Sequence, residues 1–210
     1  MPAGHGPTRG LGLLEAFLAQ RRAAVAQRWL PSGVRTGRLL DLGCGLSGWF
    51  LHRASAAEKE GLDPTCEPRE ETRQRGSLTE RLRLRRFAVG TDPLPFAADW
   101  FDGVTLLAVL EHLPREHLLP VLREVRRVLK PSGRCVATTP VHGTEGLLHG
   151  LARVGLVSHE EIEEHHRHLT EGELRELFVQ AGFPPSGLTA GRFELGMNLW
   201  IAASKQPENH

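Results

Sequence analysis

The sequence predicts an α/β domain with a doubly wound, mostly parallel sheet of seven strands, an antiparallel last strand, an N-terminal helix and a small helical cap. Three observations lead to this prediction. Apolar runs typical of strands alternate with helix-like segments along most of the chain. Residues 102–109 are apolar almost throughout, as in a central parallel strand buried on both faces. The length of 210 residues accommodates one domain with a substantial core, and not comfortably two.

The first half of the chain contains the predicted N-terminal helix and three strands. Pro31-Ser32-Gly33 ends the helix, which we expect to lie on the sheet or over a pocket. Both charge signs alternate in the Arg- and Glu-rich segment 67–86, which favours a solvated helix leading into the third strand over a binding patch. The other expected elements are a helix over 11–30, strands near 38–42 and 82–89, a helix near 47–56, and a short second strand closed by residues 61–64.

The second half continues the alternation and ends in two strands. Pro114 opens a helix with a broad apolar face, and Lys130-Pro131-Ser132-Gly133 ends it. The remaining expected elements are a strand over 134–139, short cap helices over 143–164, a helix near 171–181 ended by Gly182, and strands near 186–194 and 197–204. We therefore expect a flexible N-terminus at 1–10, one domain at 11–204 with a cap or lid at about 141–170, and a tail at 205–210.

Composition indicates an ordinary globular protein. The net charge is +1, the apolar fraction is 40%, and the arginines are spread along the chain, so no strong basic field for nucleic acid is expected. No apolar run approaches a membrane span, and the first ten residues lack the apolar core of a signal peptide. Cys44, Cys66 and Cys135 form no C-x-x-C pair, which favours a reducing, cytoplasmic setting. The oligomeric state stays open.

The most informative stretch is residues 39–48, in which an apolar strand ends in Asp41 and a glycine-rich turn follows at once. Glycine permits a sharp turn and lets a ligand approach the backbone. Gly43, Gly45 and Gly48 also match the dinucleotide pattern G-x-G-x-x-G, so the glycines alone leave an NAD enzyme open.

The charge of Asp41 discriminates between the two ligands. A carboxylate there repels a pyrophosphate but attracts the ammonium and sulfonium of S-adenosylmethionine, and such a close pair is worth roughly 4 kcal/mol in gross terms at an effective dielectric of about 20. A plain turn without a ligand needs neither the acid nor this spacing. The stretch therefore predicts an S-adenosylmethionine site.

The chain resembles the class I S-adenosylmethionine-dependent methyltransferases, in particular the small-molecule group with a Rossmann-like sheet. A single block is weak evidence for the family, whereas the order and spacing of all the blocks over about 39–183 are specific to it. The blocks are Leu39-Leu40-Asp41-Leu42-Gly43-Cys44-Gly45, Leu94-Pro95-Phe96 with Phe101-Asp102, Leu110-Glu111-His112-Leu113, Arg127-Val128-Leu129-Lys130-Pro131-Ser132-Gly133, and the weaker Leu169-Thr170-Glu171-Gly172-Glu173-Leu174 with Ala181-Gly182-Phe183.

The resemblance implies roles for particular residues. Asp41 with Gly43, Cys44 and Gly45 would hold the methionine end of the cofactor. Asp63 would accept hydrogen bonds from both ribose hydroxyls. The other implied contacts are Leu62 and Pro64 beside the adenine and Leu110 near the methionine chain.

One position departs from the family pattern. Relatives usually carry an acid about four residues before the Leu-Pro-Phe block, where this chain has Gly90. Either Thr91 or Asp92 takes over the adenine contact through a shifted loop, or backbone groups bind adenine alone.

The candidates for catalysis are Glu111, His112 and His165, because a hydroxyl acceptor benefits from a general base. A structural or cofactor-orienting role for Glu111 and His112 outweighs direct catalysis, because this pair recurs in relatives with different acceptors. The segment with His165, His166 and His168 lacks the H-E-x-x-H spacing, so we expect a charged lid helix and no metal.

The expected activity is methyl transfer to an oxygen or nitrogen of a small molecule or glycan-type precursor. Two alternatives stay open: a protein or nucleic-acid methyltransferase, and a non-catalytic cofactor-binding protein of the same fold. Against nucleic acid, Ala108-Val109-Leu110-Glu111 stands where amino-methylating enzymes carry an Asn/Asp-Pro-Pro-aromatic block, and the near-neutral chain has no Tyr for base stacking.

Overall fold

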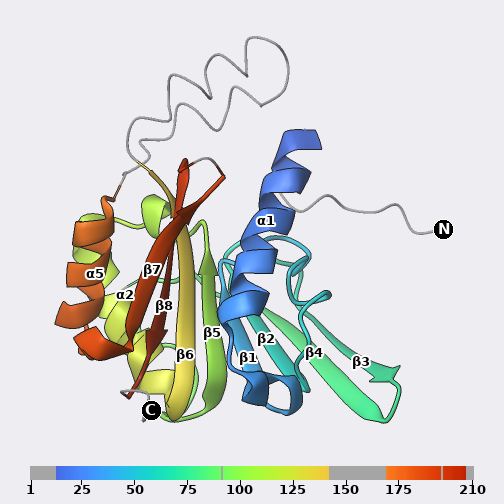
Figure 1. Cartoon of the computed structure of the whole chain (residues 1–210). Helices are drawn as coiled ribbons and strands as arrows, with labels where there is room; N and C mark the ends of the chain where they lie inside the picture. Colours follow the sequence, from blue (N-terminus) through green and yellow to red (C-terminus); the bar gives the residue numbers. More distant parts are fainter. Residues whose placement is uncertain (1–12, 91, 142–168, 195, 207–210) are drawn as a thin grey trace.

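A computed structural model describes residues 13–90, 92–141, 169–194 and 196–206. Its centre is one eight-stranded sheet in the order β3-β4-β2-β1-β5-β6-β8-β7 (Figure 1). The five strands β1, β2, β4, β5 and β6 are mutually parallel, whereas β8 runs antiparallel to both of its neighbours and β3 runs antiparallel to β4. The strands are β1 (Arg38–Leu42), β2 (Glu58–Asp63), β3 (Arg69–Arg75), β4 (Leu78–Arg86), β5 (Phe101–Leu107), β6 (Leu129–Pro140), β7 (Leu188–Phe193) and β8 (Asn198–Ser204).

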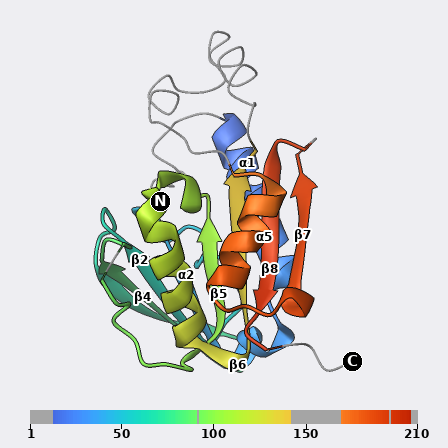
Figure 2. The same ribbon diagram turned by 90° about the vertical axis from the view of Figure 1, so that its left-hand side faces the viewer.

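Helices cover both faces of the sheet, as expected of a doubly wound fold. Figure 1 and Figure 2 show α2 and α5 on one face and α1 on the other. The helices are α1 (Leu13–Trp29), α2 (Arg115–Val128) and α5 (Glu171–Gln180), with 3₁₀ turns η1 (Ser32–Thr36), η2 (Leu110–His112) and η3 (Pro185–Gly187). No helix in these ranges is long and apolar enough to cross a membrane.

Successive side chains of each central strand point to opposite faces of the sheet and build one hydrophobic core on each face. In β1, Leu40 and Leu42 pack beneath α2 and α5, while Leu39 packs on the α1 side. In β6, Cys135 and Val136 divide between the same two cores. Because both faces of these strands are covered, they read as nearly continuous apolar runs, and this confirms the expected α/β class.

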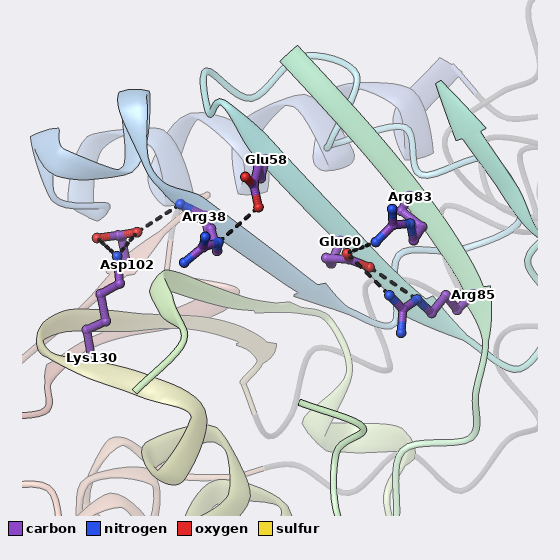
Figure 3. A network of polar contacts seen from close by, with 7 residues as sticks. All are labelled: Arg38, Glu58, Glu60, Arg83, Arg85, Asp102 and Lys130. Atoms are coloured by element: carbon purple, nitrogen blue, oxygen red, sulfur yellow. Dashed lines mark hydrogen bonds and ion pairs between the residues drawn. The ribbon is translucent and has the colours of Figure 1, made fainter. Parts of the chain in front are cut away.

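The prediction of a solvated helix leading into one strand over residues 67–86 is wrong, because this segment forms the hairpin β3–β4. The extra strand makes the sheet eight-stranded rather than seven-stranded. Gly76 makes the turn with φ of 62°. Cross-strand ion pairs use the alternating charges: Glu60 of β2 pairs with Arg83 at 3.2 Å and with Arg85 at 3.3 Å (Figure 3). Such alternation suits a solvated helix and a strand ladder equally well, and pairing with β2 decides for the ladder.

The helix expected near 47–56 is also wrong, since this segment consists of consecutive turns. Gly45 and Gly48 have φ of 68° and 64°, which a right-handed helix does not contain. The expected N-terminal tail at 1–10 and cap helices at 143–164 lie outside the described residues.

Two residues of the family-like blocks stabilise the amino edge of the sheet (Figure 3). The Asp102 carboxylate accepts hydrogen bonds from the backbone N–H of Arg38 and from Lys130 Nζ, both at 2.8 Å. Arg38 in turn donates through Nε to Glu58 at 2.9 Å. This network joins the first residues of β1, β2, β5 and β6, so these blocks hold the scaffold at the edge opposite the candidate site.

Candidate active site

The candidate site lies at the carboxyl ends of β2, β1 and β5, which are neighbours in the sheet. From β1 the chain passes to β2 on one side and only later crosses to β5 on the other, so β1 and β5 flank a topological switch point. Loops that leave adjacent parallel strands at such a point diverge and leave room for a ligand. Asp41, Asp63 and Glu111 are brought together here from the three strand ends.

Asp41 is a buried acid whose side chain is held by the next strand. Its residue is 3% exposed, and Oδ1 accepts a hydrogen bond from the Thr105 hydroxyl at 2.6 Å. Burial raises the pKa of Asp41 to about 7, the Thr105 hydrogen bond lowers it, and the nearby Asp63 charge raises it further. A cation placed beside Asp41 would favour its ionised form.

Asp63 fixes the glycine loop to the end of β2. Its Oδ2 accepts from the Gly45 backbone N–H at 2.9 Å, and its Oδ1 accepts from the backbone N–H and the hydroxyl of Thr65 at 2.7 and 2.6 Å. Three donors of the chain thus occupy this carboxylate, which has about four acceptor positions.

Two loop glycines are required for different physical reasons. Gly43 has φ of 72°, and a Cβ there would clash with Val109 Cγ2, so close packing against Val109 requires glycine at this position. Gly45 has φ of 68°, but a Cβ there would meet no atom within 4 Å. The space in front of Gly45 is therefore open to a ligand.

The remaining candidate site residues differ in their burial. Cys44 and Leu110 are buried, and burial raises the pKa of the Cys44 thiol. Pro64 and Asp92 are exposed, and Gly90 is partly buried near His117. Thr91 and His165 lie outside the described residues, as do His166 and His168.

Glu111 and His112 follow β5 in η2, and Glu111 is only 6% exposed. Burial raises the pKa of Glu111, whereas His112, Arg22 of α1 and the Thr139 hydroxyl lower it. Glu111 Oε2 has no hydrogen-bond partner of good geometry among the described residues. A buried carboxylate with one unpaired oxygen beside the open loop is a candidate ligand contact.

Sequence reasoning missed several polar residues at this edge. Thr105 carried a signal, because it is the one polar side chain within the apolar run 103–109. Arg22, Glu194 and Asn198 carried none, because they lie far apart in sequence and meet only through the fold. Among the described residues, no group of three or more His, Cys, Asp or Glu side chains could hold a metal ion.

The chain belongs to a methyltransferase family: residues 14–185 match the family model described as "Methyltransferase domain". This match confirms the expected class, an S-adenosylmethionine-dependent methyltransferase with that cofactor, and covers the site described above.

Curated relatives match over about half of the chain. A demethylmenaquinone methyltransferase of Bacillus velezensis is 36% identical over 106 residues, which are 47% of this chain and 43% of that protein. The methyltransferase GfsG of Streptomyces halstedii is 31% identical over 114 residues, which are 51% of this chain and 39% of that protein. The chain thus matches less than half the length of these relatives.

Solved structures share the fold. A methyltransferase of Burkholderia thailandensis that acts on 1,6-didemethyltoxoflavin, with bound S-adenosylhomocysteine, superposes with a TM-score of 0.60 at 20% identity, over 89% of this chain and 77% of that one. An S-adenosylmethionine-dependent methyltransferase of Mesorhizobium loti gives 0.59 at 20% identity, over 89% of this chain and 99% of that one.

Proposed function

We propose that this protein transfers a methyl group from S-adenosylmethionine to an oxygen or nitrogen of a small molecule or glycan-type precursor. The observation that carries the proposal is the pair of acids, Asp41 and Asp63, beside the open space at Gly45. When bound, the sulfonium supplies an already activated methyl carbon. The chain itself has to bind, orient and, for a hydroxyl acceptor, remove a proton.

The charges of the site fit the methionine end of this cofactor. The raised pKa of Asp41 means that its ionised form is held in the apo protein at an energetic cost, which an ammonium group would offset. The open space at Gly45 lets a ligand reach the backbone of the loop. Gly43 and Cys44 contribute by shaping that loop: both of their backbone N–H groups donate to the Leu62 carbonyl, at 2.8 and 3.3 Å.

The ribose contact at Asp63 needs a local rearrangement. Two ribose hydroxyls require two acceptor positions, whereas the chain leaves about one of four. Of the three donors, only the Thr65 hydroxyl can rotate away without moving the backbone. We therefore propose that the ribose replaces the Thr65 hydroxyl on Asp63.

The remaining cofactor contacts are proposed from position. Leu110 follows β5 beside the loop, Pro64 follows Asp63 at the end of β2, and the segment with Gly90 and Asp92 would meet the adenine. We propose an orienting role for Glu111 and His112 at the same edge, with direct catalysis by either residue as the alternative. A catalytic role for His165 likewise stays a proposal.

A small-molecule acceptor agrees with the names of the curated relatives, one of which methylates demethylmenaquinone. We propose the same broad class here, with no nucleic-acid partner. Arg81, Arg83 and Arg85 follow one another on one face of β4, but Glu60 and Glu70 pair with Arg83 and Arg85 and reduce the basic charge of this face. A reducing compartment suits Cys44, Cys66 and Cys135, which are all free and buried.

The proposal is tested by calorimetric titration of the purified protein with S-adenosylmethionine, S-adenosylhomocysteine and NAD. We expect micromolar binding of both adenosyl ligands, weakened at least tenfold by Asp41→Asn and by Asp63→Asn. Glu176→Gln removes an exposed carboxylate on α5 and should leave binding unchanged. Binding of NAD in place of both adenosyl ligands by the folded protein would contradict the proposal.

A further inference from the structure

Four polar side chains from separate parts of the chain lie near the carboxyl edge of the sheet. They are Arg22 of α1, Glu111 of η2, Thr139 near the end of β6, and Glu194 after β7, and we call them the edge cluster. Arg22 acts electrostatically on both carboxyl groups, and Thr139 lies beside Glu111. Because Glu111 follows Leu110 directly, the edge cluster adjoins the proposed cofactor site.

The edge cluster concentrates unpaired polar atoms. Seven buried side-chain nitrogen or oxygen atoms among the described residues have no hydrogen-bond partner, and four of them belong to this cluster. These atoms are Arg22 Nε, Glu111 Oε2, Thr139 Oγ1 and Glu194 Oε1. The Thr139 hydroxyl lies close enough to Glu111 to lower its pKa, so these two groups can partly satisfy each other. Arg22 Nε and Glu194 Oε1 have no hydrogen-bond partner among the described residues, and because buried polar atoms are nearly always paired, they indicate that a ligand completes them.

Glu194 is held in place by its own hairpin. Asn198 is 6% exposed and donates through Nδ2 to Glu194 Oε2 at 2.6 Å, which leaves Oε1 unpaired. The Met197 backbone N–H donates to the Glu194 carbonyl at 3.0 Å, and Glu194 has φ of 54°, uncommon for a residue with a side chain. The fold therefore fixes one carboxylate oxygen and presents the other.

The unpaired atoms define the chemistry of a ligand. Two carboxylate oxygens accept, the Arg22 N–H donates, and the Thr139 hydroxyl can do either. Two hydroxyl groups on neighbouring carbons satisfy this set. Each hydroxyl donates to one carboxylate and accepts a hydrogen bond from Arg22 or Thr139. Glu194 lies nearer to solvent than Glu111, because Glu194 is half buried as a residue whereas Glu111 is almost completely enclosed.

We propose that the edge cluster is the acceptor subsite, that it binds a vicinal diol, and that Glu194 is the general base for methylation of one hydroxyl. This inference rests on the proposed methyl transfer. The acceptor O–H bond breaks and its proton goes to Glu194 Oε1. The oxygen's electron pair forms the new bond to the methyl carbon, and the electron pair of the broken carbon–sulfur bond stays on sulfur.

The test uses protein saturated with S-adenosylhomocysteine for binding and with S-adenosylmethionine for turnover. Catechol and methyl α-D-glucopyranoside are the diol probes, and 1,2-dimethoxybenzene, whose oxygens cannot donate a hydrogen bond, is the matched control. We expect calorimetry to detect at least one diol binding at millimolar concentration or tighter, and not the dimethoxy compound. With that diol, Glu194→Gln should lower kcat at least a hundredfold with little change in KM, and Arg22→Met should raise KM about tenfold.

Control variants separate this inference from the proposed function. Glu176→Gln and Arg28→Met, both at exposed positions, should keep the wild-type kcat and KM. Glu194→Gln and Arg22→Met should bind S-adenosylhomocysteine within twofold of wild type, which also shows that they fold. Absence of diol binding by the loaded wild-type protein, or kcat/KM within twofold of wild type in both cluster variants, would overturn the inference while cofactor binding still stands. Absence of S-adenosylhomocysteine binding by the wild-type protein would instead refute the proposed function.

Discussion

Replacing Asp41 by asparagine should stabilise the apo protein at neutral and alkaline pH while weakening its cofactor binding at least tenfold. The amide has nearly the same shape as the carboxyl group and still accepts the hydrogen bond from the Thr105 hydroxyl. It differs in having no charge to be desolvated. Because the residue is 3% exposed, desolvation dominates the comparison.

The magnitude follows from the pKa of Asp41, which burial raises from 3.8 to about 7. Between these values the folded protein binds a proton that the unfolded chain has released, so the free energy of unfolding falls as pH rises through this window. One pKa unit corresponds to about 1.4 kcal/mol, so the ionised carboxylate costs about 4 kcal/mol above pH 7. About 3 kcal/mol of this arises between pH 5 and pH 8. This is a large part of the roughly 5–15 kcal/mol that stabilises a typical domain.

Urea unfolding followed by circular dichroism at pH 5 and pH 8 measures the effect. We expect the free energy of unfolding of Asp41→Asn to exceed that of the wild type by about 4 kcal/mol at pH 8 and by only about 1–2 kcal/mol at pH 5. Comparing the two proteins at each pH cancels the contributions of the other titrating groups. Glu176→Gln, which removes an exposed charge, should follow the wild type at both pH values. An Asp41→Asn difference that stays constant from pH 5 to pH 8 would refute the reasoning, because Asp41 would then not titrate in that range.

Three further sets of substitutions test how the site and the scaffold are held. Gly45→Ala should cost only about 1 kcal/mol of stability yet weaken S-adenosylhomocysteine binding at least tenfold, whereas Gly43→Ala, whose Cβ would lie 2.4 Å from a valine methyl, should unfold at clearly lower urea. Lys59→Met should lower the unfolding free energy by about 3 kcal/mol because it leaves the buried Glu80 without its 2.7 Å partner, and adding Glu80→Leu should recover most of the loss in the same urea assay. Arg127→Lys should cost about 2 kcal/mol by thermal melting, because lysine cannot hold a carboxylate and two backbone carbonyls at once; an unchanged melting temperature would contradict this.

Helices and strands whose apolar residues follow one clear periodicity were predicted correctly from the sequence. The strand expected at 38–42 is β1, residue for residue, because an apolar run closed by a glycine turn has few alternatives. The helix opened by Pro114 and the one near 171–181 are α2 and α5, the second with a capping box at Thr170 and Glu173. The hairpin at 69–86 could not be distinguished from a helix, because its charges satisfy both periods.

The sequence by itself determined the fold class, the family and the acids beside the glycine loop, since these depend on local order: strand, acid, glycine turn, and an acid at the end of the next strand. Only the tertiary structure decided which polar residues meet. It placed Asp102 and Lys130 at the amino edge, and Glu194 with Arg22 at the carboxyl edge. Interactions between residues that are 28 and 172 positions apart depend on strand order and register, which no local pattern encodes.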